Sequence, residues 1–406
     1  MGPRAAIRHL LTPTVLCLGL LAACETPPGA HPDDPAPYLE DRSFRRAVLE
    51  RDLLSHDNLY ARRRLDSYAL EGEGWDLLPT RDPPSRALTD EDRERLRMGL
   101  PLQVDPAELA SLEPPELPVD AQEWAQLGRR VMAEYPLRAD LALRTLASEP
   151  GGLERAGYLR RPDADWVGAR VFLDDDGEAQ VAPTCGQCHC SDEPWGELTP
   201  TLGNKAMDVG LGPGLVDVLP DGVDAPFAVP DLGGLASMPY LQQNANWVNS
   251  EPSTLAIRCE TLFVTANGER SRIPRTLAWA IAVWIRSQPF PPPLVSGEPD
   301  PAGREVFEGA GCPACHPPPD YTSDRLVSIE EVGTDVRARL SPWRVTGYAR
   351  IPSLRGVGRT GPYLHDGSVS SLPLLFSPKR GVPGHPWGQE LGAADRAALV
   401  RFLESI

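Results

Sequence analysis

Two pentapeptides of the form Cys-x-x-Cys-His carry the clearest chemistry in this sequence. They are Cys185-Gly-Gln-Cys188-His189 and Cys312-Pro-Ala-Cys315-His316. The spacing is typical of c-type haem attachment, in which each cysteine sulfur adds to a porphyrin vinyl group and the adjacent histidine ligates the iron. A zinc site or a redox dithiol would explain one copy, but a second copy favours haem. We therefore expect two covalently bound c-type haems, haem 1 at the first motif and haem 2 at the second.

An internal repeat follows the two motifs and predicts the architecture. Its matching segments are Val229-Pro-Asp-Leu-Gly-Gly-Leu235 with Pro239-Tyr-Leu241, and Ile351-Pro-Ser-Leu-Arg-Gly-Val357 with Pro362-Tyr-Leu364. Each half closes on a predicted helix, at 277–287 and at 393–406, and a predicted helix at 301–307 leads into the second motif. A helix, a haem loop and a closing helix form the arrangement of cytochrome c. The sequence therefore predicts a mainly α fold with two cytochrome c-type haem domains in tandem.

Few histidines remain for the opposite face of each iron. Outside the motifs and the first 23 residues, the chain has His31, His56, His365 and His385. We favour His385 as the sixth ligand of haem 2, because it lies on a Pro-Gly loop before the closing helix, where mono-haem cytochromes c carry theirs. His365 is the alternative, and a surface or propionate-contacting role would also explain either residue.

The opposite side of haem 1 lacks an equivalent histidine. The repeat places Gln242 at the position of His365, and a glutamine is a poor iron ligand. Met238 is the candidate sixth ligand in this half, with Met207 as its alternative, although a methionine is more often a packing residue. Haem 1 is therefore expected to be either His/Met-ligated or five-coordinate with an open face.

The first residues predict export. Arg4 and Arg8 precede an apolar run from Leu10 to Leu21, and Leu-Ala-Ala-Cys24 comes next. This order is typical of a bacterial lipoprotein signal, with residues 1–23 removed and a lipid on Cys24. A plain secretory signal or an uncleaved anchor is the alternative. We expect an exported lipoprotein, periplasmic or outer-membrane-anchored, which contacts the membrane through the lipid on Cys24.

Composition and apolar spacing divide the rest of the chain. Residues 24–42 are rich in Pro, Asp and Ala and predict a flexible tether. Residues 43–118 predict a helical N-terminal region without a chemical motif. A first cytochrome c domain is expected at 119–293 and a second at 294–406. Helices are also predicted from Thr89, at 121–135 and at 137–147, and a β-hairpin at 167–181 with its turn at Asp174–Gly177.

Two cysteines remain once Cys17 is removed with the signal peptide and the lipid and the haems are assigned. They are Cys190 and Cys259. Leftover thiols often pair in an oxidising periplasm, so the sequence predicts a Cys190–Cys259 disulfide. Two buried free thiols are the alternative, because a sequence does not give the separation that a disulfide requires.

The chain is strongly acidic, with a formal net charge of −17. This charge argues against a nucleic-acid partner, because nucleic acid is itself a dense array of negative charge. A redox partner protein with a basic or neutral surface is the partner that the charge favours.

The C-terminal motifs resemble the di-haem cytochrome c peroxidase superfamily, which includes the rubber oxygenases. The resemblance covers about residues 165–406 and rests mainly on Ile351–Val357, Thr360–Val369 and Gly384–Asp395, the last of which is most similar to the rubber oxygenase end. It implies two mostly helical cytochrome c domains with facing haems, and a ligand histidine at His385. The sequence departs from those peroxidases in two ways. No methionine follows Met238, and the family's Phe-Trp-Asp-Gly-Arg-type stretch is not found between the haem motifs.

Two functions stay open on this basis. The first is electron transfer through both haems. The alternative is a peroxidase-like oxidoreductase in which haem 1 binds peroxide or dioxygen and haem 2 relays electrons. In that case Gln242, Tyr240 and Trp247 are the candidate catalytic residues, because a peroxidase needs polar groups beside an open iron to assist cleavage of the O–O bond.

Overall fold

The computed structural model describes most of the chain after residue 33. The described residues are 34–53, 74–161, 166–191, 203–210, 213–216, 226–266, 268, 271–334 and 346–406. The expected signal peptide and the expected lipidation site at Cys24 lie outside them. Within the described ranges, no helix is both long enough and apolar enough to cross a lipid bilayer.

Helices make up most of the regular structure. In the first part of the chain they are α1 (Ala36–Glu40), α2 (Arg42–Asp52), α4 (Gly74–Leu77), α5 (Asp90–Arg97), α6 (Ala121–Glu134), α7 (Leu141–Ser148), α8 (Gly152–Arg155), α9 (Pro252–Ala266) and α10 (Arg275–Ser287). In the second part they are α11 (Pro301–Gly309), α12 (Ile329–Val332), α13 (Leu372–Leu375) and α14 (Ala393–Glu404). Single 3₁₀ turns are η2 (Pro106–Glu108), η3 (Cys185–Gln187), η4 (Leu235–Ser237), η5 (Cys312–Ala314) and η7 (Val357–Arg359).

The strands are short and antiparallel. One sheet has the order β1 (Ser85–Ala87), β2 (Ala169–Leu173), β3 (Ala179–Pro183). Two-stranded ribbons pair β4 (Leu215–Val216) with β5 (Phe227–Ala228), β6 (Tyr240–Leu241) with β7 (Trp247–Val248), and β8 (Val327–Ser328) with β9 (Tyr348–Ala349). The β2–β3 hairpin and its turn, in which Gly177 N–H donates to the Asp174 carbonyl, are as the sequence predicts.

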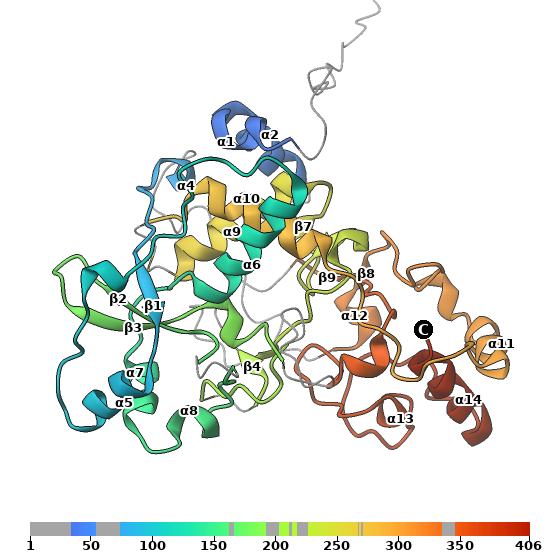
Figure 1. Ribbon diagram of the computed structural model, residues 1–406. Coiled ribbons are helices and arrows are strands. Elements are labelled where there is room, and N and C mark those ends of the chain that lie inside the picture. Colours follow the sequence, from blue (N-terminus) through green and yellow to red (C-terminus); the bar gives the residue numbers. More distant parts are fainter. Residues whose placement is uncertain are drawn as a thin grey trace, which may run out of the picture.

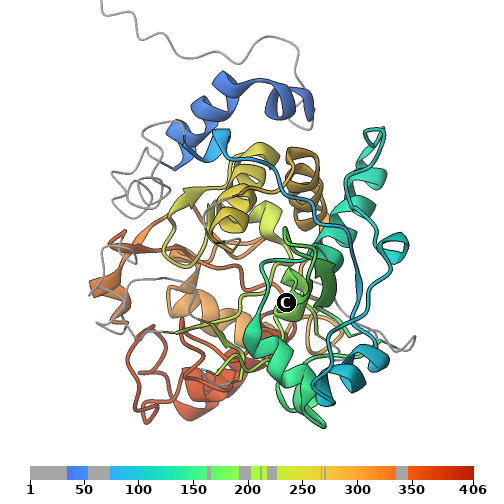
Figure 2. The same cartoon turned by 90° about the vertical axis from the view of Figure 1, so that its left-hand side faces the viewer.

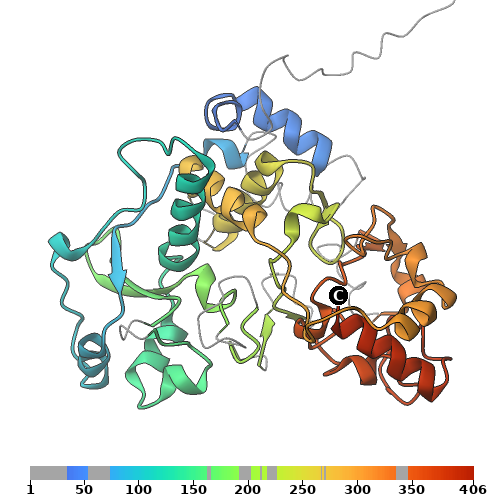
Figure 3. The same ribbon diagram turned by 45° about the vertical axis from the view of Figure 1, so that its right-hand side comes forward.

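Figure 1 shows the elements up to α10 on one side of the molecule and those from α11 onward in a smaller lobe on the other. Figure 3 shows the same division from a second direction, with the C-terminus on α14 in the smaller lobe. The proline-rich segment at 289–293 connects the two parts. Buried apolar side chains separate at the same place, because the core of the smaller lobe begins at Phe307 and the cores of the larger part end at Ile285.

The sequence analysis expected a division of the larger part at residue 118. The structure has no such division. Val48 and Leu49 of α2 belong to the same core as α6, α9 and α10. Leu88 and Leu96 belong to a second core, together with α7, α8 and the sheet. The N-terminal helices are too short to bury a core of their own, so they pack on the predicted first cytochrome c domain instead of forming a separate region.

The two halves repeat one structural plan. A leading helix, α6 or α11, crosses a closing helix, α10 or α14. At the crossing point, a β-carbon on Gly128 would collide with the Ala280 carbonyl, and one on Gly303 would collide with the Ala398 carbonyl. The sequence repeat also recurs in the backbone, because Gly234 (φ 69°) and Gly356 (φ 68°) both adopt the left-handed conformation and begin the equivalent turns η4 and η7. The predicted helices at 121–135, 277–287, 301–307 and 393–406 are thus confirmed.

Gly303→Ala should destabilise the smaller lobe, although alanine normally favours a helix by about 1 kcal/mol over glycine. The added methyl group has no room against the Ala398 carbonyl, and overpacking of this kind costs about 1–3 kcal/mol. Gly309→Ala is the matched control, because Gly309 lies in the same helix and its β-carbon would meet no atom within 4 Å. Denaturant unfolding of both variants measures the two effects. Equal stability of the two variants would contradict the close helix crossing.

The N-terminal helices α1 and α2 lie across α9 and α10 at one end of the molecule (Figures 1 and 2). Tyr38 of α1 is fully buried, stacks on Trp279 at 5.5 Å, and donates a hydrogen bond from its hydroxyl to Glu260 of α9. Arg45 of α2 pairs with Asp76 at 2.7 Å. Residues 36–41 are therefore packed structure, which corrects the expected flexible tether at 24–42 for this portion.

Helix α9 is the longest of the described helices, and the sequence analysis did not predict it. Its side chains are buried on all faces, and polar residues such as Thr254, Arg258 and Glu260 are among them. A helix that is buried all round lacks the one-sided apolar period by which a surface helix is recognised. Glu260 is held between Tyr38 and Arg275, and the Nε atom of Arg275 lies 3.6 Å from Oε1 of Glu260. Despite this cation, burial raises the pKa of Glu260 to about 6 from its ordinary value of 4.5.

The raised pKa of Glu260 predicts a pH-dependent stability. The folded state binds this proton more tightly than the unfolded state, so the stabilisation is complete below pH 4.5 and is lost as the pH rises through about 6. Relative to Glu260→Gln, which does not titrate, the wild-type free energy of unfolding should fall by about 2 kcal/mol between pH 4 and pH 7. Chemical denaturation at a series of pH values measures this difference. A difference that stays constant or grows with pH would refute the burial argument.

Candidate haem-binding sites

Both Cys-x-x-Cys-His motifs form the same local structure. Each begins with a 3₁₀ turn, η3 or η5, and then brings its histidine back over the first cysteine. His189 N–H donates to the Cys185 carbonyl at 3.1 Å, and His316 N–H donates to the Cys312 carbonyl at 2.9 Å. The turn therefore presents two thiols and one imidazole from a single loop, which is the arrangement that covalent haem attachment requires.

The two motif histidines are oriented by the same kind of hydrogen bond. Nδ1 of His189 lies 3.1 Å from the Pro230 carbonyl, and Nδ1 of His316 lies 3.0 Å from the Tyr321 carbonyl. A carbonyl only accepts, so each Nδ1 must carry the proton, which leaves the lone pair of Nε2 for a metal. Burial lowers the pKa of His189 to about 4 and lowers that of His316, so both rings are neutral near pH 7. This donor set fits an iron-bound haem.

Polar side chains hold the two loops in shape. Asn204 holds the first loop. Its backbone N–H donates to the Cys188 carbonyl at 2.7 Å, and its Nδ2 donates to the Gln187 carbonyl at 3.1 Å. In the second loop, Ser323 donates from Oγ to the Cys315 carbonyl at 2.8 Å. The sequence analysis did not single out either residue, since the contacts are made from outside the motifs.

His385 lies beside His316 in the smaller lobe. The pKa of His385 is lowered to about 4, first by burial and then by the neighbouring His316 and Arg380. Its Nδ1 is buried without a hydrogen-bond partner among the described residues, and its ring packs between Phe376 and Trp387. A buried ring nitrogen without a partner is costly unless a metal or another group satisfies it. The geometry therefore favours His385 for the side of haem 2 opposite His316.

Arg380 positions the loop that carries His385. Its guanidinium donates to the Leu375 carbonyl at 2.8 Å, to the Val382 carbonyl at 3.0 Å and to the Gly384 carbonyl. His385 itself has φ 45°, a backbone conformation that side chains other than glycine rarely adopt. The three carbonyl contacts hold this strained loop against the lobe. The sequence did not indicate that Arg380 positions this loop, because a single arginine in a Pro-Gly loop forms no recognisable pattern.

His365, the alternative ligand, is held in another way. Its Nδ1 lies 3.0 Å from Thr334 Oγ1 and 3.9 Å from Asp366 Oδ1. Its backbone carbonyl accepts from Ala228 N–H at 2.9 Å and from Gln243 Nε2 at 3.3 Å, so the residue joins the two parts of the molecule. These contacts indicate a structural position at the junction.

Replacing His385 with alanine should open haem 2 to an external ligand. In the reduced, haem-loaded protein, His385→Ala should bind about one more carbon monoxide per molecule than the wild type, because the sixth position of haem 2 is vacated. His365→Ala is the control and should bind the same amount as the wild type. Optical titration of the Soret band with carbon monoxide counts the sites. An extra site in His365→Ala instead of His385→Ala would reverse the ligand assignment.

The two methionine candidates for haem 1 lie in different surroundings. Met238 belongs to the core of α6, α9 and α10, and its sulfur accepts a hydrogen bond from Arg350 Nη1 at 3.1 Å. Met207 is buried in the other core of the larger part, in which Cys188 also packs. The Arg350 contact engages the Met238 sulfur, which argues against Met238 as an iron ligand. A sixth ligand from a methionine stays a prediction for either residue.

The three candidate catalytic residues come together on one ribbon. Tyr240 and Trp247 belong to β6 and β7, and Gln242 follows β6 with φ 59°. Trp247 is buried in the core, whereas Tyr240 and Gln242 are half-buried. The Gln242 amide contacts Asn246 and the guanidinium of Arg258 from α9. Both partners are buried polar residues that the sequence analysis missed, because α9 was not recognised as part of the site.

The two remaining cysteines are buried. Cys259 is a free thiol, so the predicted Cys190–Cys259 disulfide is not formed in this structure and stays a prediction for the oxidised protein. Burial, and then the nearby Cys259 thiol, raise the pKa of Cys185 to about 12. Cys259 therefore lies next to the first haem-attachment cysteine, on the α9 side of the site.

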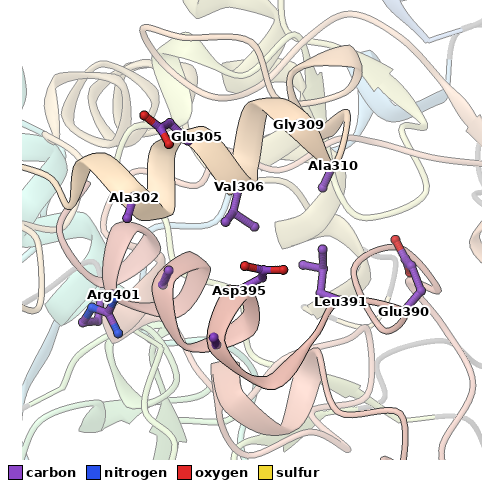
Figure 4. A pocket seen from close by; sticks show the side chains of 11 residues that line it. Ala302, Glu305, Val306, Gly309, Ala310, Glu390, Leu391, Asp395 and Arg401 are labelled. Atoms are coloured by element: carbon purple, nitrogen blue, oxygen red, sulfur yellow. The ribbon is translucent and has the colours of Figure 1, made fainter.

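A groove runs between α11 and α14 on the outside of the smaller lobe, with a volume of about 710 Å³. Val306 and Asp395 point toward each other across it (Figure 4), and Glu305, Glu390 and Arg401 also line it. Arg401 pairs with Asp300 at 2.6 Å, which leaves the groove acidic over an apolar floor. Glu390 contributes to raising the pKa of Cys312, which places the groove beside the second motif.

Comparisons with known proteins find one partial relative. No family model matches the chain. A stretch of 119 residues is 34% identical to methylamine utilization protein MauG from Methylorubrum extorquens AM1, which covers 26% of this chain and 33% of MauG. The chain thus spans about a third of the length of that relative.

Two solved structures share its general outline only weakly. One is a xenon-pressurised hydrazine synthase of Kuenenia stuttgartiensis, with 15% identity, a TM-score of 0.39, and coverage of 75% of this chain and 98% of that one. The other is a MauG-like protein associated with microbial copper homeostasis, with 16% identity, a TM-score of 0.37, and coverage of 72% and 92%. Scores of this size do not establish a shared fold, so the sequence match to MauG is the informative comparison.

Proposed function

We propose that this protein is a c-type di-haem oxidoreductase of the cytochrome c peroxidase type, with haem 1 as its reactive centre and haem 2 as its electron relay. The observation that carries the proposal is the asymmetry between the two sites. In the described part of the chain, both histidines outside the motifs belong to residues 346–406, and only His385 lies beside a motif histidine. Haem 2 would thus have a histidine on each side, and haem 1 on one side only.

The partial match to MauG supports an oxidoreductase over a simple electron carrier, because MauG is a protein of the di-haem cytochrome c peroxidase type. The electron-carrier interpretation, which the sequence analysis favoured, needs a sixth ligand at both irons. Met238 is its first candidate at haem 1, and that sulfur already accepts a hydrogen bond from Arg350. The contact supports the open-face alternative.

When bound, c-type haem supplies a redox-active iron that can accept peroxide or dioxygen or pass an electron. The residues of the chain would supply the rest. His189 would hold the iron from one side, since its Nδ1 proton is tied to the Pro230 carbonyl. On the other side, the Gln242 amide, held by Arg258 and Asn246, would orient a small oxygen ligand by hydrogen bonds.

The partner and the location are also part of the proposal. The acidic groove between α11 and α14 lies beside the second motif and offers a docking surface for a basic redox partner. Export and attachment to the membrane through a lipid on Cys24 remain as the sequence predicts, outside the described residues. A lipid tether would hold the acidic protein near membrane-associated redox partners.

Peroxide reactivity tests the proposal. In protein prepared with haem 2 reduced, hydrogen peroxide should oxidise that haem rapidly, because the two haems together would supply the two electrons that reduction of peroxide to water requires. Gln242→Leu should slow this reaction at least tenfold, since loss of one stabilising hydrogen-bond donor typically costs about 10²–10³ in rate. Gln122→Leu, the same change at an exposed position at the start of α6, should react at the wild-type rate. Stopped-flow spectroscopy follows the reduced haem.

Two results would count against the proposal. A reduced haem 2 that survives excess peroxide would leave electron transfer as the better function. Equal rates for Gln242→Leu and the wild type would remove Gln242 from the reactive site while leaving the oxidoreductase class intact.

A further inference from the structure

Arg350 is a half-buried cation without a carboxylate partner among the described residues. It directly follows β9, and its Nη1 donates to Met238 Sδ and to the Tyr240 carbonyl, both at 3.1 Å. Its backbone N–H donates to the Gln243 carbonyl at 2.9 Å. These acceptors all belong to the larger part of the molecule, and none of them is charged. Burial alone lowers the pKa of Arg350 to about 10.

Three other arginines that are shielded from solvent in this protein are paired with carboxylates. Arg45 and Arg275 both contact Asp76. Arg86 forms an ion pair with Asp92 at 2.6 Å. Removing an arginine from solvent without an anion is costly, so an anion is expected beside Arg350 as well. None of the described side chains supplies it.

The free edge of the guanidinium indicates what the anion is. Nη1 makes both side-chain hydrogen bonds, and the Nε–Nη2 edge has no partner among the described residues. That edge is the planar fork that binds a carboxylate through two parallel hydrogen bonds. The missing group is therefore expected to be a carboxylate that does not come from the described polypeptide.

Arg350 belongs to the smaller lobe and reaches the larger part. Two residues further along, the carbonyl of Pro352 lies near the ring of His316. The guanidinium, however, points back to the Met238–Gln243 loop of the larger part, which includes the candidate residues Tyr240 and Gln242. The junction has an approximate symmetry, since Ala228 N–H donates to the His365 carbonyl as Arg350 N–H donates to the Gln243 carbonyl. Ala228 and Arg350 occupy equivalent positions in the repeat, and only Arg350 carries a positive charge.

We propose that the Nε–Nη2 edge of Arg350 binds a propionate carboxylate of haem 1, so that one residue from the smaller lobe fixes both the haem and the loop above it. The inference rests on the proposed function, because it requires a haem at Cys185–His189. It assigns the propionate to haem 1 because both side-chain contacts of Arg350 are made to the first half of the repeat.

The reduction potential of haem 1 tests the role. Arg350→Gln removes the positive charge and leaves the propionate uncompensated, which favours the ferric state. The equilibrium constant for reduction of haem 1 should fall at least tenfold in Arg350→Gln, and Arg350→Lys should recover most of it. Arg355→Gln is the matched control, because Arg355 lies in the same segment but is exposed and pairs with Asp320 at 3.8 Å. Spectroelectrochemical titration of each variant separates the two haems.

Mass spectrometry of the same samples first establishes how many haems each variant carries. A wild type without covalent haem would overturn the proposed function and this inference together. Fully loaded Arg350→Gln with an unchanged haem 1 potential would overturn the inference alone. A shift confined to haem 2, or an equal shift in Arg355→Gln, would overturn the assignment to haem 1. Thermal unfolding of Arg350→Lys distinguishes a charge effect from a general loosening of the junction.

Discussion

The hydrogen bond from each motif histidine to a backbone carbonyl is the constraint on which the rest of the structure depends. It fixes the tautomer of His189 and His316 and leaves Nε2 of each ring with its lone pair for an iron. The carbonyls that take part belong to Pro230 and to Tyr321. Both carbonyls must therefore be held at a set distance from their Cys-x-x-Cys-His loops. The helix pairs α6–α10 and α11–α14 and the tight turns η4 and η7 provide that frame.

The junction between the two parts adds a second constraint. Reciprocal backbone hydrogen bonds join Ala228 to His365 and Arg350 to Gln243, so the loop above each site is supported by the other half. A displacement at one site would thus be felt at the loop of the other. The differences between the two sites include His385 against no described histidine, and Arg350 against Ala228. Those differences, rather than the shared frame, would separate a relay haem from a reactive one.

Local patterns in the sequence were sufficient for the parts of the site that lie within short segments. The Cys-x-x-Cys-His spacing, the repeated Val/Ile-Pro segments and the amphipathic closing helices are all visible without a structure. Arg258, Arg350 and Glu260 could not be found in that way, because their partners lie far away in the chain. Arg350 contacts Met238, and Glu260 contacts Tyr38. Tyr38 also explains why a segment with the composition of a tether is folded, since one buried aromatic ring and its hydrogen bond fasten it to α9 and α10.

The central claim is that the two haem sites are unequal, with a histidine on both sides of haem 2 and on one side of haem 1. Low-temperature electron paramagnetic resonance of the resting ferric protein tests this most directly, because coordination number sets the spin state of each iron. The account predicts one low-spin signal from haem 2 and one high-spin signal from haem 1 in equal amounts. Two low-spin signals of equal intensity would contradict it and would return haem 1 to a six-coordinate electron carrier.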